Sequence, residues 1–272
     1  MKPLRILMAA AMISAAAVSV QGCNSIMSKD ECLNTNWEAR GENDGIAGKA
    51  SSIISEYHEA CDDYRPMDES SYRRGRERGA KAYCVPERLY NTGVAGTELT
   101  DICSSVPGSA ELMVYYQRGQ MVYLAQQQLD TIDGMVQICS ILADKGRWQS
   151  RRYRILEIGQ AASKVRPKAK AALDKVRAAG MKKDVAVPDL LEEMKSSGMI
   201  NTVLRYADAD QKLDEIEKKM ADYEKSRENS RQCMYSSSKK LAKSCSESYD
   251  YYSQQISELR QERYEIWSQV GI

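Results

Sequence analysis

The C-terminal third of this 272-residue chain carries two apolar repeats that can face each other, which constrains its fold more than any other feature. Both repeats have spacings of three and four, as in a helix with one apolar stripe. In antiparallel register, the residue numbers of facing pairs add to one constant for Leu213 with Ile266, Met220 with Leu259, and Tyr223 with Ile256. The numbers of Cys233 and Cys245 add to a value that is smaller than this constant by one. The pattern therefore predicts an antiparallel coiled-coil hairpin with a disulfide near its tip.

Helical patterns dominate the rest of the chain, so we expect an all-α protein. There is no sustained alternation of Val, Ile and Thr between hairpin turns. Phe is absent and Tyr occurs sixteen times, so Leu, Ile, Val, Met, Ala and Tyr must form the core. Cap and breaker residues predict a long helix from Ser109 to Lys145–Gly146, a second over about 149–165, a third begun by Pro167, and a short one after Pro188 that ends at Gly198.

These patterns divide the chain into four segments. Residues 1–22 are a predicted signal peptide, and residues 23–125 form a disulfide-bridged cluster of short helices rich in Cys, Gly and Tyr. Residues 126–200 are a basic helical region, and residues 201–272 form the hairpin.

The first 23 residues are typical of a bacterial lipoprotein signal. Lys2 and Arg5 precede an apolar run over 6–20 that is too short to read as a spanning helix. Val20-Gln21-Gly22-Cys23 then supplies a cleavage-and-lipidation box, so we expect acyl chains, palmitate among them, on Cys23. Asn24 is not the aspartate associated with inner-membrane retention in enteric bacteria, which favours an outer-membrane lipoprotein facing the periplasm. An ordinary secreted protein and an uncleaved anchor are the alternatives.

The other seven cysteines predict structural disulfides, because an exported chain lies where such bonds persist. Four of them lie within residues 32–103 of the segment 23–125, which we call the N-terminal module, and helix order there favours the pairs Cys32–Cys61 and Cys84–Cys103 among three connectivities. Cys139 is then the odd thiol. The chain has no C-x-x-C pair and a single histidine, His58, so we expect neither a metal site nor a cofactor. His58 beside Glu59 could act as a general base, but a structural or exposed histidine is the commoner case.

The N-terminal module repeats a spacing of aromatic residues and glycines. The two clearest stripes are Trp37, Gly41, Gly45 and Gly48, followed by Tyr72, Gly75, Gly79 and Tyr83. Glycine inside a helix costs about 1 kcal/mol relative to alanine, so each stripe needs a compensating reason. Close helix packing is the favoured reason. An aromatic-floored groove for a glycan or peptide is the alternative, with Trp37, Asp44, Tyr72 and Tyr83 as candidate binding residues.

The string Trp37…Asp44-Gly45…Gly48…Cys61…Tyr72…Gly75…Gly79…Tyr83-Cys84 resembles domain-of-unknown-function family 2799 of Gram-negative lipoproteins over about residues 32–125. The resemblance implies an envelope lipoprotein but no reaction, because the family has no assigned activity. The family pattern has a histidine four residues before the second cysteine. Here Tyr57 occupies that position and the histidine is His58.

Residues 144–183 are strongly basic, with thirteen Lys and Arg against three acids. Lys164, Lys168, Lys175 and Lys182 can share one helix face, which could lie on anionic lipid. The favoured alternative is a solvated face paired with acids elsewhere, such as Asp208, Asp210, Asp214, Glu215 and Glu217. Nucleic acid is excluded as a partner by the expected compartment.

No Walker, Rossmann, G-x-S-x-G or S-x-x-K string is present, and no pair of catalytic residues stands out. We therefore expect a non-catalytic adaptor or structural lipoprotein that presents helical surfaces to an envelope protein partner. A lipoprotein that binds peptidoglycan or another glycan is the alternative.

Overall fold

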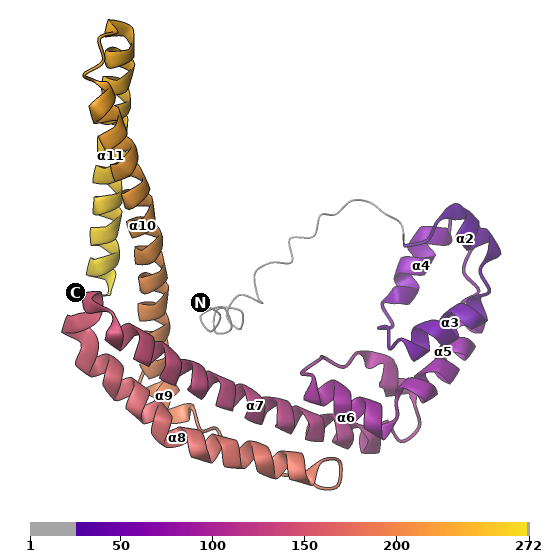
Figure 1. The fold of residues 1–272 in the computed structure, drawn as a ribbon. Helices are drawn as coiled ribbons and strands as arrows, with labels where there is room; N and C mark the ends of the chain where they lie inside the picture. Colours follow the sequence, from indigo (N-terminus) through magenta and orange to yellow (C-terminus); the bar gives the residue numbers. More distant parts are fainter. Residues whose placement is uncertain (1–25, 271–272) are drawn as a thin grey trace. The chain divides into compact units, whose positions relative to one another are not determined.

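A computed structural model describes residues 26–270, and every regular element in that range is helical (Figure 1). The all-α prediction is therefore confirmed. The elements are α2 (Lys29–Asn34), α3 (Trp37–Ile46), α4 (Ile53–Cys61), α5 (Glu69–Tyr83), α6 (Pro86–Val94), η1 (Asp101–Ser105), α7 (Ser109–Asp144), η2 (Gly146–Arg151), α8 (Arg152–Ala179), α9 (Glu192–Ser196), α10 (Met199–Cys233) and α11 (Lys239–Gln269).

The described chain forms two compact units. One contains residues 26–131 and 166–190, and the other contains residues 132–165 and 191–270. The helices α7 and α8 each contribute to both units, and α7 runs unbroken through residue 125, where the sequence patterns suggest a segment boundary. Residues 166–190 join the first unit because Leu173 and Val176 of α8 pack with Val122 and Ala125 of α7.

Glycines let α3 and α5 touch through their backbones. A β-carbon at Gly75 would lie 1.9 Å from the carbonyl oxygen of Glu38, and one at Gly45 would lie 2.8 Å from the α-carbon of Gly79. Gly48 follows the end of α3 with φ of +72°, and a β-carbon there would meet the ring of Tyr83. The glycine stripes are thus explained by close helix packing.

A second pair, α6 with the start of α7, repeats this construction. The string Asn43-Asp44-Gly45-Ile46-Ala47-Gly48 recurs as Asn91-Thr92-Gly93-Val94-Ala95-Gly96. A β-carbon at Gly93 would lie 2.2 Å from the carbonyl oxygen of Tyr116, and Gly96, with φ of +66°, lies against the ring of Tyr123. The module therefore contains two copies of one glycine-packed helix pair.

Three disulfides are present, and they are the pairs expected from the sequence: Cys32–Cys61, Cys84–Cys103 and Cys233–Cys245. The first joins α2 to α4 beside Trp37, Tyr57 and Tyr72 in one apolar core. The second joins the end of α5 to η1, in a core with Leu89, Ile102 and Tyr116. Each glycine-packed pair thus has a disulfide in its core.

The prediction of two helices divided before Pro167 is wrong. α8 is one helix from Arg152 to Ala179, with Pro167 inside it. Proline removes a single backbone hydrogen bond, and here its ring is exposed. The buried positions Ile158, Ala162, Ala169 and Leu173 keep helical spacing through this point, so packing outweighs the local penalty.

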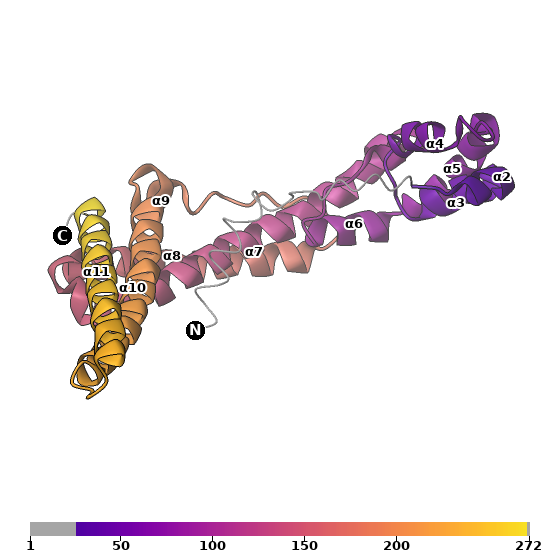
Figure 2. The same cartoon turned by 90° about the horizontal axis from the view of Figure 1, so that it is seen from above.

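The C-terminal hairpin is formed by α10 and α11, which lie side by side in both views (Figures 1 and 2). The aliphatic positions of the predicted register are all buried, and its two tyrosines, Tyr223 and Tyr252, are half-buried. The buried positions are Leu213, Ile216 and Met220 on α10, and Ile256, Leu259 and Ile266 on α11. The Tyr223 and Tyr252 rings lie 5.9 Å apart, and Arg260 pairs with Glu224 at 3.7 Å. These contacts confirm the antiparallel hairpin.

Candidate functional site

A buried carboxylate, Asp44, is the centre of the most elaborate polar cluster in the glycine-packed module. Its Oδ2 accepts hydrogen bonds from the hydroxyls of Tyr57 at 2.7 Å and Tyr72 at 3.0 Å, and its Oδ1 pairs with Lys49 Nζ at 2.8 Å. Arg40 Nε donates to the Tyr57 hydroxyl at 2.9 Å. Only 3% of Asp44 is exposed, so the carboxylate is held by these donors inside the packing of α3, α4 and α5.

The cluster shifts the pKa of both tyrosines and of Lys49 in the direction expected for a structural site. Burial raises the pKa of Tyr57, and the neighbouring Asp44 carboxylate adds to the effect. Burial and Asp44 raise the pKa of Tyr72 as well. The hydrogen bond to Asp44 raises the pKa of Lys49. These shifts favour neutral phenols and a charged lysine, so none of Tyr57, Tyr72 and Lys49 is suited to exchange a proton.

Three of the four candidate binding residues from the sequence meet in this cluster, but as core rather than as a groove. The rings of Trp37, Tyr57 and Tyr72 contact each other edge to face, with centroids 5.5 to 6.5 Å apart. Trp37 is 5% exposed, and Tyr57 and Tyr72 are fully buried, so a glycan ring cannot stack on them. The fourth candidate, Tyr83, lies elsewhere, against Gly48 and under the guanidinium of Arg88 at 4.3 Å.

Tyr57, like Arg40 and Lys49, belongs to the cluster but was not a candidate binding residue in the sequence analysis. It occupies the position where the family pattern has a histidine, and its hydroxyl bridges Arg40 to Asp44. The substitution was visible in the sequence, but its bonding to a residue thirteen positions earlier was not.

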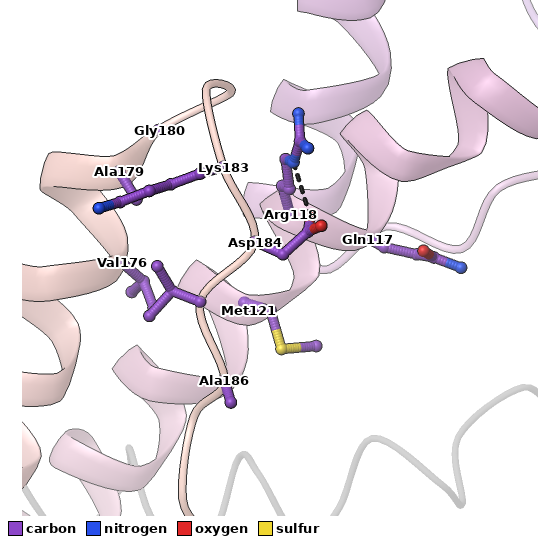
Figure 3. A pocket seen from close by; sticks show the side chains of 10 residues that line it. Gln117, Arg118, Met121, Val176, Ala179, Gly180, Lys183, Asp184 and Ala186 are labelled. Atoms are coloured by element: carbon purple, nitrogen blue, oxygen red, sulfur yellow. Dashed lines mark hydrogen bonds and ion pairs between the residues drawn. The ribbon is translucent and has the colours of Figure 1, made fainter.

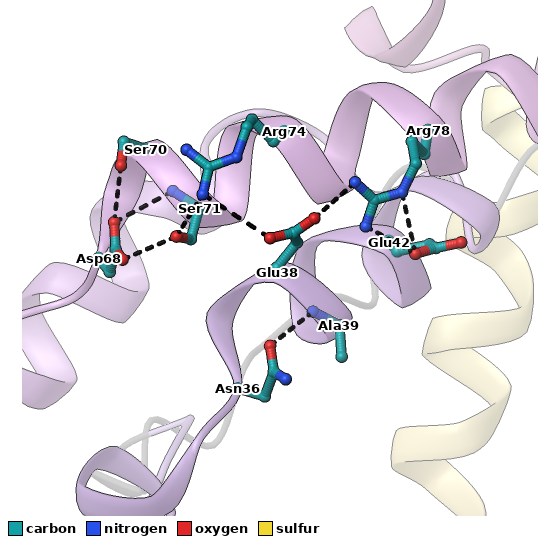
Figure 4. A network of polar contacts seen from close by, with 9 residues as sticks. All are labelled: Asn36, Glu38, Ala39, Glu42, Asp68, Ser70, Ser71, Arg74 and Arg78. Carbon is teal, nitrogen blue, oxygen red and sulfur yellow. Dashed lines mark hydrogen bonds and ion pairs between the residues drawn. The ribbon is translucent and has the colours of Figure 1, made fainter.

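An ion-pair ladder covers the exposed side of the α3–α5 contact (Figure 4). Arg78 donates to Glu38 at 2.6 Å and to Glu42 at 3.0 Å, and Arg74 lies 3.7 Å from Glu38. Hydrogen bonds from Arg78 lower the pKa of Glu38. The ladder spans the two helices but is solvent-exposed, so it should add little to their stability.

His58 links α4 to the start of α5. Its Nε2 lies 3.2 Å from a Glu69 carboxylate oxygen, and its Nδ1 lies 3.5 Å from Asp62. The side chain is about one-third exposed, and Glu69 also pairs with Arg73. The structural interpretation of His58 therefore fits its contacts better than that of a general base.

Part of the basic stretch pairs with the acids of α10, as the favoured interpretation expects. Lys145 Nζ donates to Asp210 at 2.5 Å and to Asp214 at 2.9 Å, and Arg147 donates to Asp214 at 2.7 Å and to Glu217 at 2.9 Å. Burial alone would lower the pKa of Lys145, but the hydrogen bonds to both aspartates outweigh it and raise that pKa. These bonds fix η2 against α10.

Trp148 completes this second polar cluster, and the sequence analysis did not identify it. The indole is fully buried, donates from Nε1 to Asp210 Oδ1 at 2.9 Å, and lies 5.1 Å from the Tyr206 ring. The available signal was Asp210 itself, because an acid stands in the apolar spacing of Val203, Tyr206 and Leu213. A buried acid in such a stripe requires a donor from another element.

Five lysines of the basic stretch are solvated. Lys164, Lys168, Lys175, Lys182 and Lys183 are exposed and have no ion pair within the described residues, whereas Lys170 pairs with Asp174 at 3.0 Å. Near the end of α8, Arg118 donates to Asp184 and to the Met181 carbonyl, beside a cavity of about 290 Å³ (Figure 3). The cavity wall is largely apolar, from Met121, Val176 and Ala179 among others, and the bonds from Arg118 fasten residues 181–184 to α7.

The remaining candidates add no reactive group. Cys139 is free and buried, and burial raises the pKa of its thiol to about 11. Within residues 26–270 no three His, Cys, Asp or Glu side chains are placed to share a metal ion, and no helix is both long and apolar enough to cross a membrane. The predicted signal peptide, Cys23 and Asn24 lie outside the described residues.

Residues 36–121 match the model of the family described as "Protein of unknown function (DUF2799)", which confirms the resemblance over the two glycine-packed helix pairs. No curated protein and no solved structure matches the chain significantly. The glycine-packed module of this chain is therefore similar to that family, and its remaining helices lie outside the match.

Proposed function

We propose that this protein is a lipid-anchored cell-envelope protein that acts as a non-catalytic adaptor or structural lipoprotein, presenting helical surfaces to another envelope protein. The observation that carries the proposal is the Asp44 cluster. The polar and ionisable side chains of this cluster bond to each other, and its tyrosine rings are buried between helices. What the module offers to a partner is the outer surface of its helices.

Two observations support the envelope location. The lipidation box ending at Cys23 follows an apolar signal run, and the mature chain carries three disulfides. Disulfides of this kind persist in the oxidising periplasm and are rare in the cytosol. We further propose that the acylated Cys23 holds the protein in the outer membrane with its folded part in the periplasm.

Peptidoglycan or glycan binding stays the alternative function. It would require a surface other than Trp37 and Tyr72, because both side chains are buried. No specific observation favours such a surface over a protein partner.

Anchoring is tested by the variant Cys23→Ser. It should move the protein from the membrane fraction to the soluble periplasm or leave an uncleaved precursor, and the mass of acyl chains should be missing from its N-terminal peptide. Asn24→Asp is the matched control, since it keeps the acylated cysteine and should shift the protein only toward the inner membrane. Unchanged fractionation and mass in Cys23→Ser would exclude the anchor.

The adaptor role is tested by comparing two capture experiments on the wild-type protein. Crosslinking in whole cells should join the protein to a specific envelope protein, and purified peptidoglycan should not retain the folded chain above a bead control. Retention by peptidoglycan without any protein crosslink would support the alternative.

A further inference from the structure

The turn between α10 and α11 is held in a defined conformation. We call residues 229–246 the hairpin tip. α10 ends at Cys233, the Ser236 amide donates to the Cys233 carbonyl at 3.0 Å, and the Ser238 hydroxyl accepts from the amide of Leu241 at the start of α11. The Cys233–Cys245 disulfide closes the two helices behind the turn. Side chains on the tip are therefore presented from a fixed scaffold.

Three large apolar side chains on the tip are left uncovered. Tyr235 is 86% exposed, Leu241 is 50% exposed and Met234 is 37% exposed. Single exposed apolar residues are ordinary, but these three lie within eight positions of one closed turn. Hairpin packing does not need them, because the seam of α10 and α11 uses Leu213, Ile216, Met220 and their partners.

The charge of the tip has one sign. Residues 229–246 contain four cations, Arg231, Lys239, Lys240 and Lys243, and no Asp or Glu. Arg231 and Lys243 reach the bordering Glu228 at 3.7 Å and Glu247 at 4.0 Å, whereas Lys239 and Lys240 have no ion pair in the described part of the chain. These two lysines occupy the first turn of α11, which holds no acid. Cations there oppose the helix dipole, so helix stability does not explain them.

We propose that the hairpin tip docks on an anionic phospholipid membrane surface. Tyr235, Met234 and Leu241 enter the interfacial layer, where amphipathic aromatic rings and apolar side chains are favoured. Lys239 and Lys240, at the positive end of α11, then face lipid phosphates. The inference concerns a site other than the N-terminal anchor and does not rest on the proposed function.

A membrane fits this surface better than an acidic protein. A stable protein interface buries about 800 Å² on each partner, with a well-packed apolar centre. The tip offers three separate apolar side chains on a narrow turn, which is little area for such an interface. Attachment to lipid needs no matching groove, because each cation near an anionic surface and each inserted side chain contributes on its own.

Vesicle binding tests the proposal directly. The chain is produced from Asn24 onward with its disulfides formed, so that every described residue is present and no acyl group is attached. We expect it to sediment with vesicles of phosphatidylethanolamine and phosphatidylglycerol, and not with phosphatidylcholine vesicles. The double variant Lys239→Ala/Lys240→Ala should lower the partition coefficient about thirty-fold, and Tyr235→Ser should lower it several-fold.

The matched control is Lys218→Ala/Lys219→Ala, which removes an adjacent exposed lysine pair from the same hairpin away from its tip. It causes the same change in net charge and should lower partitioning less than two-fold. Circular dichroism and urea unfolding establish that all variants are folded. The proposal is overturned if anionic vesicles are not bound, or if the tip and control pairs have equal effects. It is also overturned if photo-crosslinkers at Tyr235 in cells capture an acidic protein while vesicles stay unbound.

Discussion

The glycine-packed module and the C-terminal hairpin bring helices together in opposite ways. In the module, α3 and α5 meet backbone to backbone because Gly41, Gly45, Gly75 and Gly79 lack side chains. In the hairpin, α10 and α11 meet through a seam of large buried side chains such as Leu213 and Ile256. Both regions also carry a disulfide between neighbouring helical elements.

The difference predicts opposite sensitivities. The contact between α3 and α5 should tolerate no added atom, because the atoms nearest to these four glycines are backbone atoms that cannot move aside. The hairpin should tolerate conservative swaps but lose stability when side-chain volume is removed. The following changes are chosen to test this contrast.

The largest effect is expected for Gly75→Leu. A β-carbon there would lie 1.9 Å from the Glu38 carbonyl oxygen, so α3 and α5 must separate and expose the Asp44 cluster. We expect a loss of more than about 5 kcal/mol, beyond ordinary overpacking, with loss of the native module. Hydrogen exchange resolved by peptide should report it, with protection lost over residues 36–84 and kept over 199–269.

The control is Gly146→Leu, because nothing lies within 4 Å of a β-carbon at Gly146. This variant should change the unfolding free energy by less than about 0.5 kcal/mol. Equal effects of the two substitutions would mean that backbone contact does not hold the module together.

Leu213→Ala should give the next largest effect. The Leu213 side chain is fully buried in the hairpin seam, so its removal leaves a cavity and should cost about 3 kcal/mol. Leu241→Ala, the same change at a half-exposed tip position, should cost less than about 0.5 kcal/mol. Urea unfolding followed by circular dichroism measures both, and similar losses would contradict the side-chain seam.

Asp44→Asn probes the polar core of the module with almost no change of volume. The amide keeps one acceptor for the tyrosine hydroxyls but leaves Lys49 without its charged partner, so we expect a loss of about 2 kcal/mol. Asp174→Asn is the comparison, since Asp174 is exposed and pairs only with Lys170. The free energy of unfolding of Asp174→Asn, measured in the same way with urea, should lie within about 0.5 kcal/mol of the wild-type value. An unchanged free energy of unfolding in Asp44→Asn would show that the buried charge does not stabilise the module.

The sequence predicts most where the signal is local and least where the partner is distant. The hairpin could be predicted because its spacing, its serine turn and the pair Cys233 and Cys245 agree within one segment. Glycine stripes predicted close packing, but they could not say that Gly45 meets Gly79 while Gly93 meets Gly119.

The sequence suggested ion pairs between the basic stretch and the acids of α10, but it could not predict the buried hydrogen bonds of the two polar clusters, for the same reason. Asp210 binds Trp148 across 62 positions, and Tyr72 reaches Asp44 across 28, so neither bond leaves a short motif. Pro167 did not end the helix because the burial of Ala162 and Ala169 on both sides outweighs the cost of a proline inside a helix, about 3 kcal/mol. Local rules are overridden where tertiary packing supplies more free energy than the rule costs.

The smallest effect is expected at Asp68, the exposed N-cap residue of α5, where the free energy of unfolding should depend on pH. Asp68 caps α5, accepting bonds from the Ser71 amide and hydroxyl and from the Ser70 hydroxyl, which lower its pKa from 3.8 to about 2 (Figure 4). Because the folded state holds its proton less tightly than the unfolded state, this contribution is complete above about pH 4 and is lost as pH falls toward about 2. Asp68→Asn keeps a capping oxygen but cannot titrate. The wild type should therefore lose stability relative to Asp68→Asn over that interval, as measured by urea unfolding at stepped pH. A constant difference between the two proteins would show that the cap charge does not act on α5.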